Sequence, residues 1–343
     1  GSGNPVGRLC RDGCVGPRGA YRDGAPGRFA GAKRAVTPRA RLTYAGVLIL
    51  LGAGWGLTMP LTKIAVSTGY KHFGLIFWQL AIGAVVMSAI ALLRGTGLPM
   101  GRAQIRVYVV IALIGSLLPN SASYQAAVHL PSGVLSLLLS MIPIWAFPIA
   151  LLLALDRFEW RRFAGLVTGL SAVMLLVMPG ADMTGSIPTI WLLVGLVSGL
   201  FYAFEGNYVA RWGTAGLDPI QVLWGASLIG AAVALPLALA SGQWVDPRPP
   251  YGAADIAQVI SATLHVLVYA GYVWLVGQAG PVFAVQISYL VTLFGVFWAK
   301  LVLDEAYPPV IWVALGLMLL GMYLVQPRKA SLEAHAPMGE SGR

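Results

Sequence analysis

A single carboxyl group stands out among the apolar segments of this sequence. Glu205, in GLFYAFEGNYVARW, is the only acidic residue well inside such a segment, and Tyr202 and Asn207 lie close to it along the chain. A charged group at the centre of a membrane helix costs about 2.5–3.5 kcal/mol, so it tends to face a cavity or a partner. Two roles fit Glu205: a protonatable gate or counter-charge for a substrate amine, or a carboxylate that pairs with Arg211 or a lipid headgroup.

An imidazole and several amide side chains inside the apolar segments are further candidates for functional residues. His265 lies near the middle of the segment ATLHVLVYAGY, where it acts either as a proton relay or as a neutral, hydrogen-bonded side chain. Gln79, Asn120, Gln125 and Gln286 need hydrogen-bond partners in an apolar interior. Such amides serve either as fasteners between helices, worth about 0.6 kcal/mol each, or as the lining of a cavity.

Aromatic side chains occur at depth as well as near the ends of the apolar segments. Trp55, Trp145, Tyr202 and Tyr289 are deep enough to form an aromatic wall for an apolar or cationic substrate, although ordinary packing explains them equally well. The complete set of predicted substrate-binding residues is Trp55, Gln79, Asn120, Trp145, Tyr202, Glu205, Asn207, His265, Gln286 and Tyr289.

Motifs for metals, nucleotides and hydrolytic catalysis are missing from the sequence. The two cysteines, Cys10 and Cys14, have no histidine near them, which argues against a metal site. There is no G-x-x-x-x-G-K-[ST], H-E-x-x-H or G-x-S-x-G motif. We therefore expect no cofactor and no enzymatic activity, since an intramembrane enzyme would have to rely on Glu205 with His265.

The composition limits the elements that position these groups. Of 343 residues, 57% are hydrophobic and 10% charged, whereas soluble domains carry about 25% charged residues. The mean hydropathy is +0.75. These values exclude a soluble enzyme, a disordered chain and a disulfide-rich secreted module, and they favour an all-α polytopic membrane protein.

Charges, prolines and glycines divide the chain into ten apolar segments. A helix that spans the bilayer needs about 20 residues. The predicted transmembrane helices are 42–66, 73–93, 106–128, 132–155, 160–178, 189–210, 219–240, 256–277, 281–303 and 308–326. The second half of the third is polar, and Pro143 and Pro148 make the fourth our candidate for a moving gate.

The distribution of basic residues predicts the orientation. With a cytoplasmic N-terminus, nineteen Lys and Arg residues face the cytoplasm and four face outward. Nine of the nineteen lie in residues 1–41, which we expect to be a disordered basic tail; residues 327–343 form the second tail. Both termini are therefore predicted to be cytoplasmic, and the net charge of +10 marks topology and not nucleic-acid binding.

The chain also contains an internal repeat. Segments 42–178 and 189–325 each hold five predicted helices, and LALDRFEWRRFAGLVTGL in the first resembles LVLDEAYPPVIWVALGLM in the second. Asp156 and Glu305, in these two turns, are 149 residues apart. Because five is odd, the two halves enter the membrane from opposite sides, as the inverted repeats of secondary transporters do.

Together these features resemble the EamA family of the drug/metabolite transporter superfamily. The resemblance rests on Trp55-Gly56 in the first helix and on an acidic turn before a glycine-spaced last helix in each half, with Gly165, Gly316 and Gly321. Gln79 stands where such families often carry an arginine, and Leu155-Asp156 replaces their Gly-Glu. The resemblance implies an efflux carrier in the cytoplasmic membrane of a bacterium, but the missing arginine weakens any transfer of anion recognition.

Two functions of different classes follow. The first is a secondary transporter that exports a small metabolite, amino acid or amine by alternating access and is driven by protons. The second is a membrane scaffold or sensor without a transport cycle. The expected partners are the lipid bilayer and, for the transporter, a small-molecule substrate; the sequence leaves open whether two copies form a homodimer.

Overall fold

The computed structural model describes residues 38–177, 189–279, 281–284 and 286–326, and every regular element in this part of the chain is a helix. The two predicted tails, with Cys10 and Cys14, lie outside the described residues, apart from residues 38–41 at the start of the first helix. The bundle considered below is formed by residues 42–326.

The first half contains five spans built from eight helical elements, one of which is a π-helical turn. They are α1 (Pro38–Val66), α2 (His72–Arg94), α3 (Arg102–Ala112) continued by the π-helical turn η1 (Leu113–Leu117) and α4 (Leu118–His129), α5 (Ser132–Leu139) with α6 (Ile142–Leu152), and α7 (Trp160–Val177).

The second half repeats this pattern. Its elements are α8 (Thr189–Trp212), α9 (Pro219–Ala240), α10 (Ala253–Ala279), α11 (Pro281–Ala284) with α12 (Ile287–Leu303), and α13 (Pro309–Val325). The ten predicted spans are therefore confirmed. Most of their ends lie within three residues of the predicted ones, because the charges and turn residues that limit an apolar helix are visible in the sequence.

The third and fourth spans are not regular α-helices. The π-helical turn comes directly before Leu118 and Pro119, and it keeps the third span continuous over Arg102–His129 despite its polar second half. The fourth span is interrupted at Ser140 and Met141, just before Pro143, because proline cannot donate an intrahelical hydrogen bond. Pro60, Pro148 and Pro236 lie inside helices that continue past them.

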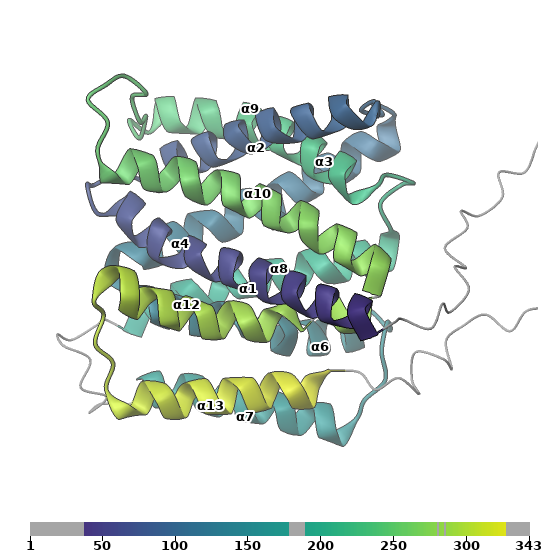
Figure 1. The fold of residues 1–343 in the computed structure, drawn as a ribbon, viewed down its shortest axis with the longest axis vertical. Coiled ribbons are helices and arrows are strands. Elements are labelled where there is room, and N and C mark those ends of the chain that lie inside the picture. The colour runs from purple at the N-terminus through teal and green to yellow at the C-terminus, as the bar shows by residue number, and fades with distance from the viewer. Residues whose placement is uncertain (1–37, 178–188, 280, 285, 327–343) are drawn as a thin grey trace, which may run out of the picture. The chain divides into compact units, whose positions relative to one another are not determined.

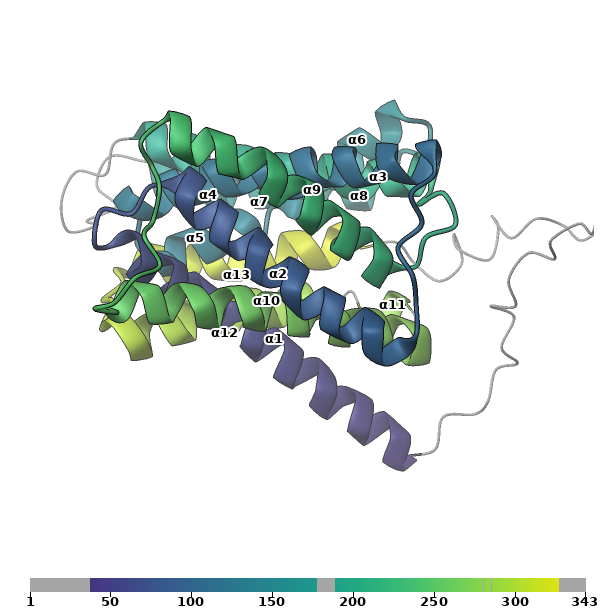
Figure 2. The ribbon, with the colours of Figure 1, turned by 90° about the horizontal axis from the view of Figure 1, so that it is seen from above.

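Corresponding spans of the two halves pack against each other. α2 packs against α9, α5 against α12, and α7 against α13, and α7 and α13 lie together in Figure 1. The first spans are exchanged: α1 lies beside α10 and α12 of the second half (Figure 2), whereas α8 packs against α4 and α6 of the first. This arrangement places residues of both halves around a shared interior.

Candidate functional site

An aromatic cluster joins the first span to the eighth. The indole of Trp55 on α1 meets three rings of α10 edge-on, with centroid distances of 5.6 Å to His265, 6.3 Å to Tyr269 and 6.2 Å to Tyr272. Two glycines allow this approach. A Cβ on Gly54 would lie 2.9 Å from Val268 Cγ2, and one on Gly56 would lie 2.8 Å from the backbone nitrogen of Gly295 on α12. The glycines beside Trp55 therefore set its position.

Glu205 faces the π-helical turn of the third span. A Cβ added to Gly115 would lie only 2.5 Å from the carboxyl carbon of Glu205, so glycine is needed for this contact. Neither ion pair among the described residues includes Glu205. Arg211, which was one predicted partner, instead places its guanidinium 5.9 Å from the ring of Trp212.

Two tyrosines lie in the neighbourhood of this carboxyl group. Tyr202 and Tyr269 both lie near enough to Glu205 to interact with it electrostatically. The hydroxyl of Tyr202 donates a hydrogen bond to Oδ1 of Asn120 at 2.9 Å. Tyr269 also contacts Trp55, so it connects Glu205 to the aromatic cluster. A carboxyl group with aromatic residues in its neighbourhood suits an ammonium group, which is attracted by the charge and by the ring quadrupoles.

A second polar chain runs through Gln79. Its Oε1 accepts a hydrogen bond of 2.8 Å from the hydroxyl of Tyr124, and the same hydroxyl lies 3.5 Å from Oε1 of Gln258. The amide of Gln258 donates to the carbonyl of Leu75 at 2.8 Å. Tyr124 and Gln258 were not among the predicted site residues. Gln258 could have been predicted from the sequence, because it lies seven residues before His265 and therefore on the same face of α10.

The other predicted residues do not join these groups. Asn207 donates to the carbonyls of Ala146 and Ala203, so its amide fastens α8 to α6. Gln286 is exposed at the start of α12. Trp145 Nε1 and the Tyr289 hydroxyl are buried and have no hydrogen-bond partner among the described residues. The candidate site therefore contains Trp55, Gln79, Asn120, Tyr202, Glu205 and His265, with Tyr124, Gln258 and Tyr269 added by the structure.

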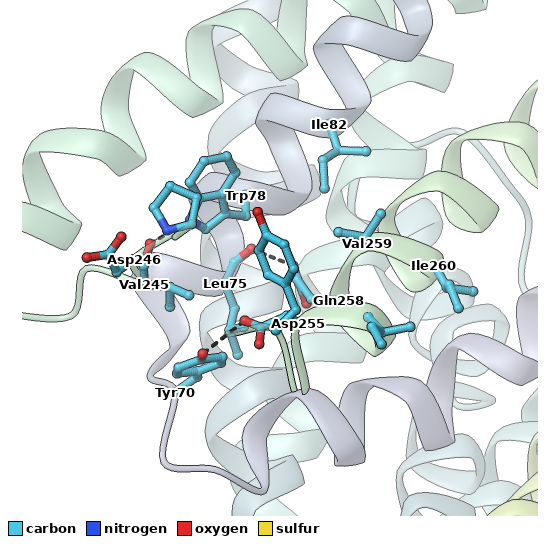
Figure 3. Close-up of a pocket in the computed structure, with 13 residues that line it drawn as sticks. Tyr70, Leu75, Trp78, Ile82, Val245, Asp246, Asp255, Gln258, Val259 and Ile260 are labelled. Carbon is cyan, nitrogen blue, oxygen red and sulfur yellow. Dashed lines mark hydrogen bonds between the residues drawn. The ribbon is translucent and has the colours of Figure 1, made fainter. Parts of the chain in front are cut away.

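A cavity of about 540 Å³ lies between α2, α10 and the loop that precedes α10 (Figure 3). Gln258 forms part of its lining, and so do Tyr70 and Asp255. The hydroxyl of Tyr70 donates to Oδ1 of Asp255 at 2.9 Å. Because Gln258 also contacts Tyr124, this cavity adjoins the polar chain that leads to Gln79.

The family of this protein follows from a comparison with known families. The model of the EamA-like transporter family matches residues 43–178 and again residues 189–326. The chain belongs to the EamA-like transporter family. It is thus a membrane transporter and not an enzyme, and the two matches correspond to the two halves of the fold. Family membership also decides between the two functions left open by the sequence, in favour of transport.

Individual relatives of this EamA-like transporter are distant. It is 23% identical over 297 residues to the uncharacterized inner membrane transporter YedA of Escherichia coli K12, covering 84% of this chain and 92% of the relative. It is 25% identical over 292 residues to the probable terminal-alkyne amino-acid exporter of Streptantibioticus cattleyicolor, covering 82% and 92%. A protein of known crystal structure shares the fold, with a TM-score of 0.57 and 19% identity over 87% of this chain and 98% of the other.

Proposed function

We propose that this EamA-like transporter is a secondary active exporter of a small amine or amino acid, driven by protons. The observation that carries the proposal is the surroundings of Glu205. Its carboxyl group is not ion-paired with any described side chain, lies against Gly115, and is close to Tyr202 and Tyr269. A group in this position can exchange a proton for a cationic substrate, because a single carboxylate neutralises only one of them at a time.

The two-half architecture supports alternating access as the transport mechanism. Trp55 and His265 come from different halves, as do Asn120 and Tyr202, so the site lies where the halves meet. In transporters built from inverted repeats, relative movement of the halves opens such a site first to one side and then to the other. The interrupted fourth span, α5 and α6, supplies the hinge between two packed segments.

The relatives support the direction of transport and the location. The Streptantibioticus cattleyicolor protein is named a probable amino-acid exporter, and YedA is named an inner membrane transporter. For this chain we accordingly propose export across the bacterial cytoplasmic membrane. The excess of Lys and Arg on one side supports two cytoplasmic termini.

Flux measurements in proteoliposomes test the proposal. Purified protein should move a radiolabelled amine or amino acid in response to a pH gradient, without nucleotide. Glu205→Gln keeps the shape of the side chain but cannot release a proton, so we expect gradient-driven flux to fall at least 100-fold. Glu159→Gln, in the turn before α7, serves as the matched control and should transport normally. Flux that is independent of pH and unchanged by Glu205→Gln would refute the proton-coupled role of Glu205.

A further inference from the structure

The cavity between α2 and α10 has the chemistry of a binding site separate from Glu205. We propose that it is a second station for the transported molecule and that it binds an amine with an apolar body. This inference rests on the proposed function, since it assumes that the substrate is cationic. It concerns a different carboxyl group, however, and can be tested by binding alone.

One end of the cavity is polar and contains the carboxyl group of Asp255. Asp255 accepts hydrogen bonds from the hydroxyl of Tyr70 at 2.9 Å and from the backbone N–H of Gly252 at 2.8 Å. Neither ion pair among the described residues involves it. By contrast, Asp246 at the same cavity is paired with Arg248. Among the residues that the structure describes, no basic side chain therefore forms an ion pair with Asp255.

Tyr70 contributes a hydrogen-bond donor to the polar end of the cavity. Its hydrogen bond to Asp255 raises the pKa of the Tyr70 phenol, so the group remains a neutral donor at physiological pH. The aromatic rings of Trp78 and Tyr251 also line the cavity, and Tyr251 is 64% exposed. A carboxylate with aromatic rings nearby matches an ammonium group.

The other end of the cavity is apolar. Figure 3 shows Tyr70 and Asp255 together on one side and Ile82, Val259 and Ile260 on the other. Val259 is 52% exposed, so the cavity reaches the surface of the bundle. A volume of about 540 Å³ lies within the range of about 300–1,000 Å³ that is typical of small-molecule sites. The two ends together fit a molecule with a cationic head and an apolar body.

One face of α10 connects this cavity to the central site. Asp255, Gln258, His265, Tyr269 and Tyr272 are separated by three or four residues or by seven, so they share one face of the helix. Between the two sites stands Gln258, which is 6% exposed and contacts Tyr124, the partner of Gln79. Rearrangement of this hydrogen-bonded group would let a substrate pass along α10 between Asp255 and Glu205.

Calorimetric titration tests this second station. The full-length protein in lipid nanodiscs is titrated with phenethylamine, and its neutral analogue 2-phenylethanol provides the uncharged comparison. We expect two binding events with phenethylamine. Asp255→Asn retains an acceptor for Tyr70 and Gly252 but removes the charge, so it should weaken one event at least tenfold. Val259→Trp fills the exposed cavity and should remove the same event, whereas Glu205→Gln should affect only the other.

Asp304→Asn is the matched control, because it removes a carboxylate from an exposed loop outside the cavity. A single event that Glu205→Gln abolishes, or a second event that survives both Asp255→Asn and Val259→Trp, would overturn the station and leave the proposed function intact. An event that depends on Asp255, together with flux that is independent of Glu205, would refute the proposed function and support the station.

Discussion

Equivalent residues of the two halves form different contacts at the two ends of the bundle. The last turn of α1 carries Lys63, whose Nζ donates to the carbonyls of Ala127 at 2.7 Å and Leu130 at 2.9 Å, at the end of α4. The last turn of α8 carries Arg211, which is exposed and has no hydrogen bond to the described residues at the end of α10. Lys63 therefore caps the end of a neighbouring helix, whereas Arg211 does not.

The acidic turns show the same contrast. Glu305 accepts hydrogen bonds from the backbone N–H groups of Ser132 at 2.8 Å and Gly133 at 3.2 Å, at the start of α5, and from the hydroxyl of Tyr307. Asp156, its counterpart in the first half, pairs with Arg162 close to it in sequence. Lys63 and Glu305 thus hold the α4–α5 turn from both sides, and we call this arrangement the clamp.

At the opposite end, arginine side chains join the last spans of the two halves. Arg161 and Arg162 on α7 donate to the carbonyls of Tyr323 and Val325 at the end of α13. Gln104 also donates to the carbonyl of Ala215 at 3.2 Å, and Gln221 donates to the carbonyl of Gly97 at 2.9 Å, so amide side chains join the halves at this end as well. Among the described residues, the clamp thus uses a lysine and a glutamate on one turn, whereas the opposite end uses arginines and glutamines spread over several turns. The capping charges match the helix ends, with a cation at carbonyls and an anion at amides.

The largest effect is expected from Glu305→Ala. This change leaves two backbone N–H groups and the Tyr307 hydroxyl without their acceptor, and hydrogen bonds to charged groups contribute about 1.5–3 kcal/mol each. We expect a loss of about 3 kcal/mol in stability, measured by thermal unfolding of the purified protein. The exposed neighbour provides the control, because Asp304→Asn should change stability by less than about 0.5 kcal/mol. Equal losses for the two variants would contradict the clamp.

Arg162→Met should cost about 2 kcal/mol, because it leaves Asp156 and the carbonyl of Val325 without their partner. Arg162 is 6% exposed, and its guanidinium lies 4.4 Å from the ring of Phe147. The distance between spin labels on Thr68 and Ala306, at the Lys63 end, should nevertheless stay unchanged. A longer distance would show that α7 and α13 also determine the arrangement at the Lys63 end.

Lys63→Met should cost about 1.5 kcal/mol through the lost hydrogen bonds, and it should lengthen the Thr68–Ala306 spin-label distance. Arg211→Met is its counterpart at the other end and should have almost no effect on either quantity. The double variant Lys63→Glu, Glu305→Lys should not recover, because each charge would then face the wrong helix end. Recovery would mean that the two side chains act mainly as a direct ion pair.

The smallest effect is expected from Gly133→Ala. The new Cβ would lie 2.6 Å from Cζ of Tyr307, so the ring must move, at a cost of about 1 kcal/mol. The double variant Gly133→Ala, Tyr307→Phe should lose less stability than the sum of the two single changes, since the phenylalanine lacks the crowding hydroxyl. Strict additivity in thermal unfolding would argue against a direct contact at this position.

Much of the fold could be predicted because membrane helices are defined locally. About 20 apolar residues are needed for each span, and charges, prolines and glycines mark where a span stops, so all ten were recognised. Glu205 could also be singled out, because an acid in an apolar helix is rare. The direction in which each polar residue points was less accessible: Asn120 and Gln125 both seemed able to line a cavity, yet Gln125 is exposed and bonds to Ser121 of its own helix.

The sequence by itself determined the number of spans, their limits, the repeat and the presence of one acidic group in the interior. Only the tertiary structure decided that Glu205 faces Gly115, that Tyr124 joins Gln79 to Gln258, and that Lys63 and Glu305 hold one turn. The physical reason is the separation along the chain of the residues that each effect involves. Hydropathy acts on consecutive residues, whereas these contacts join residues between 45 and 173 positions apart and depend on how the helices pack.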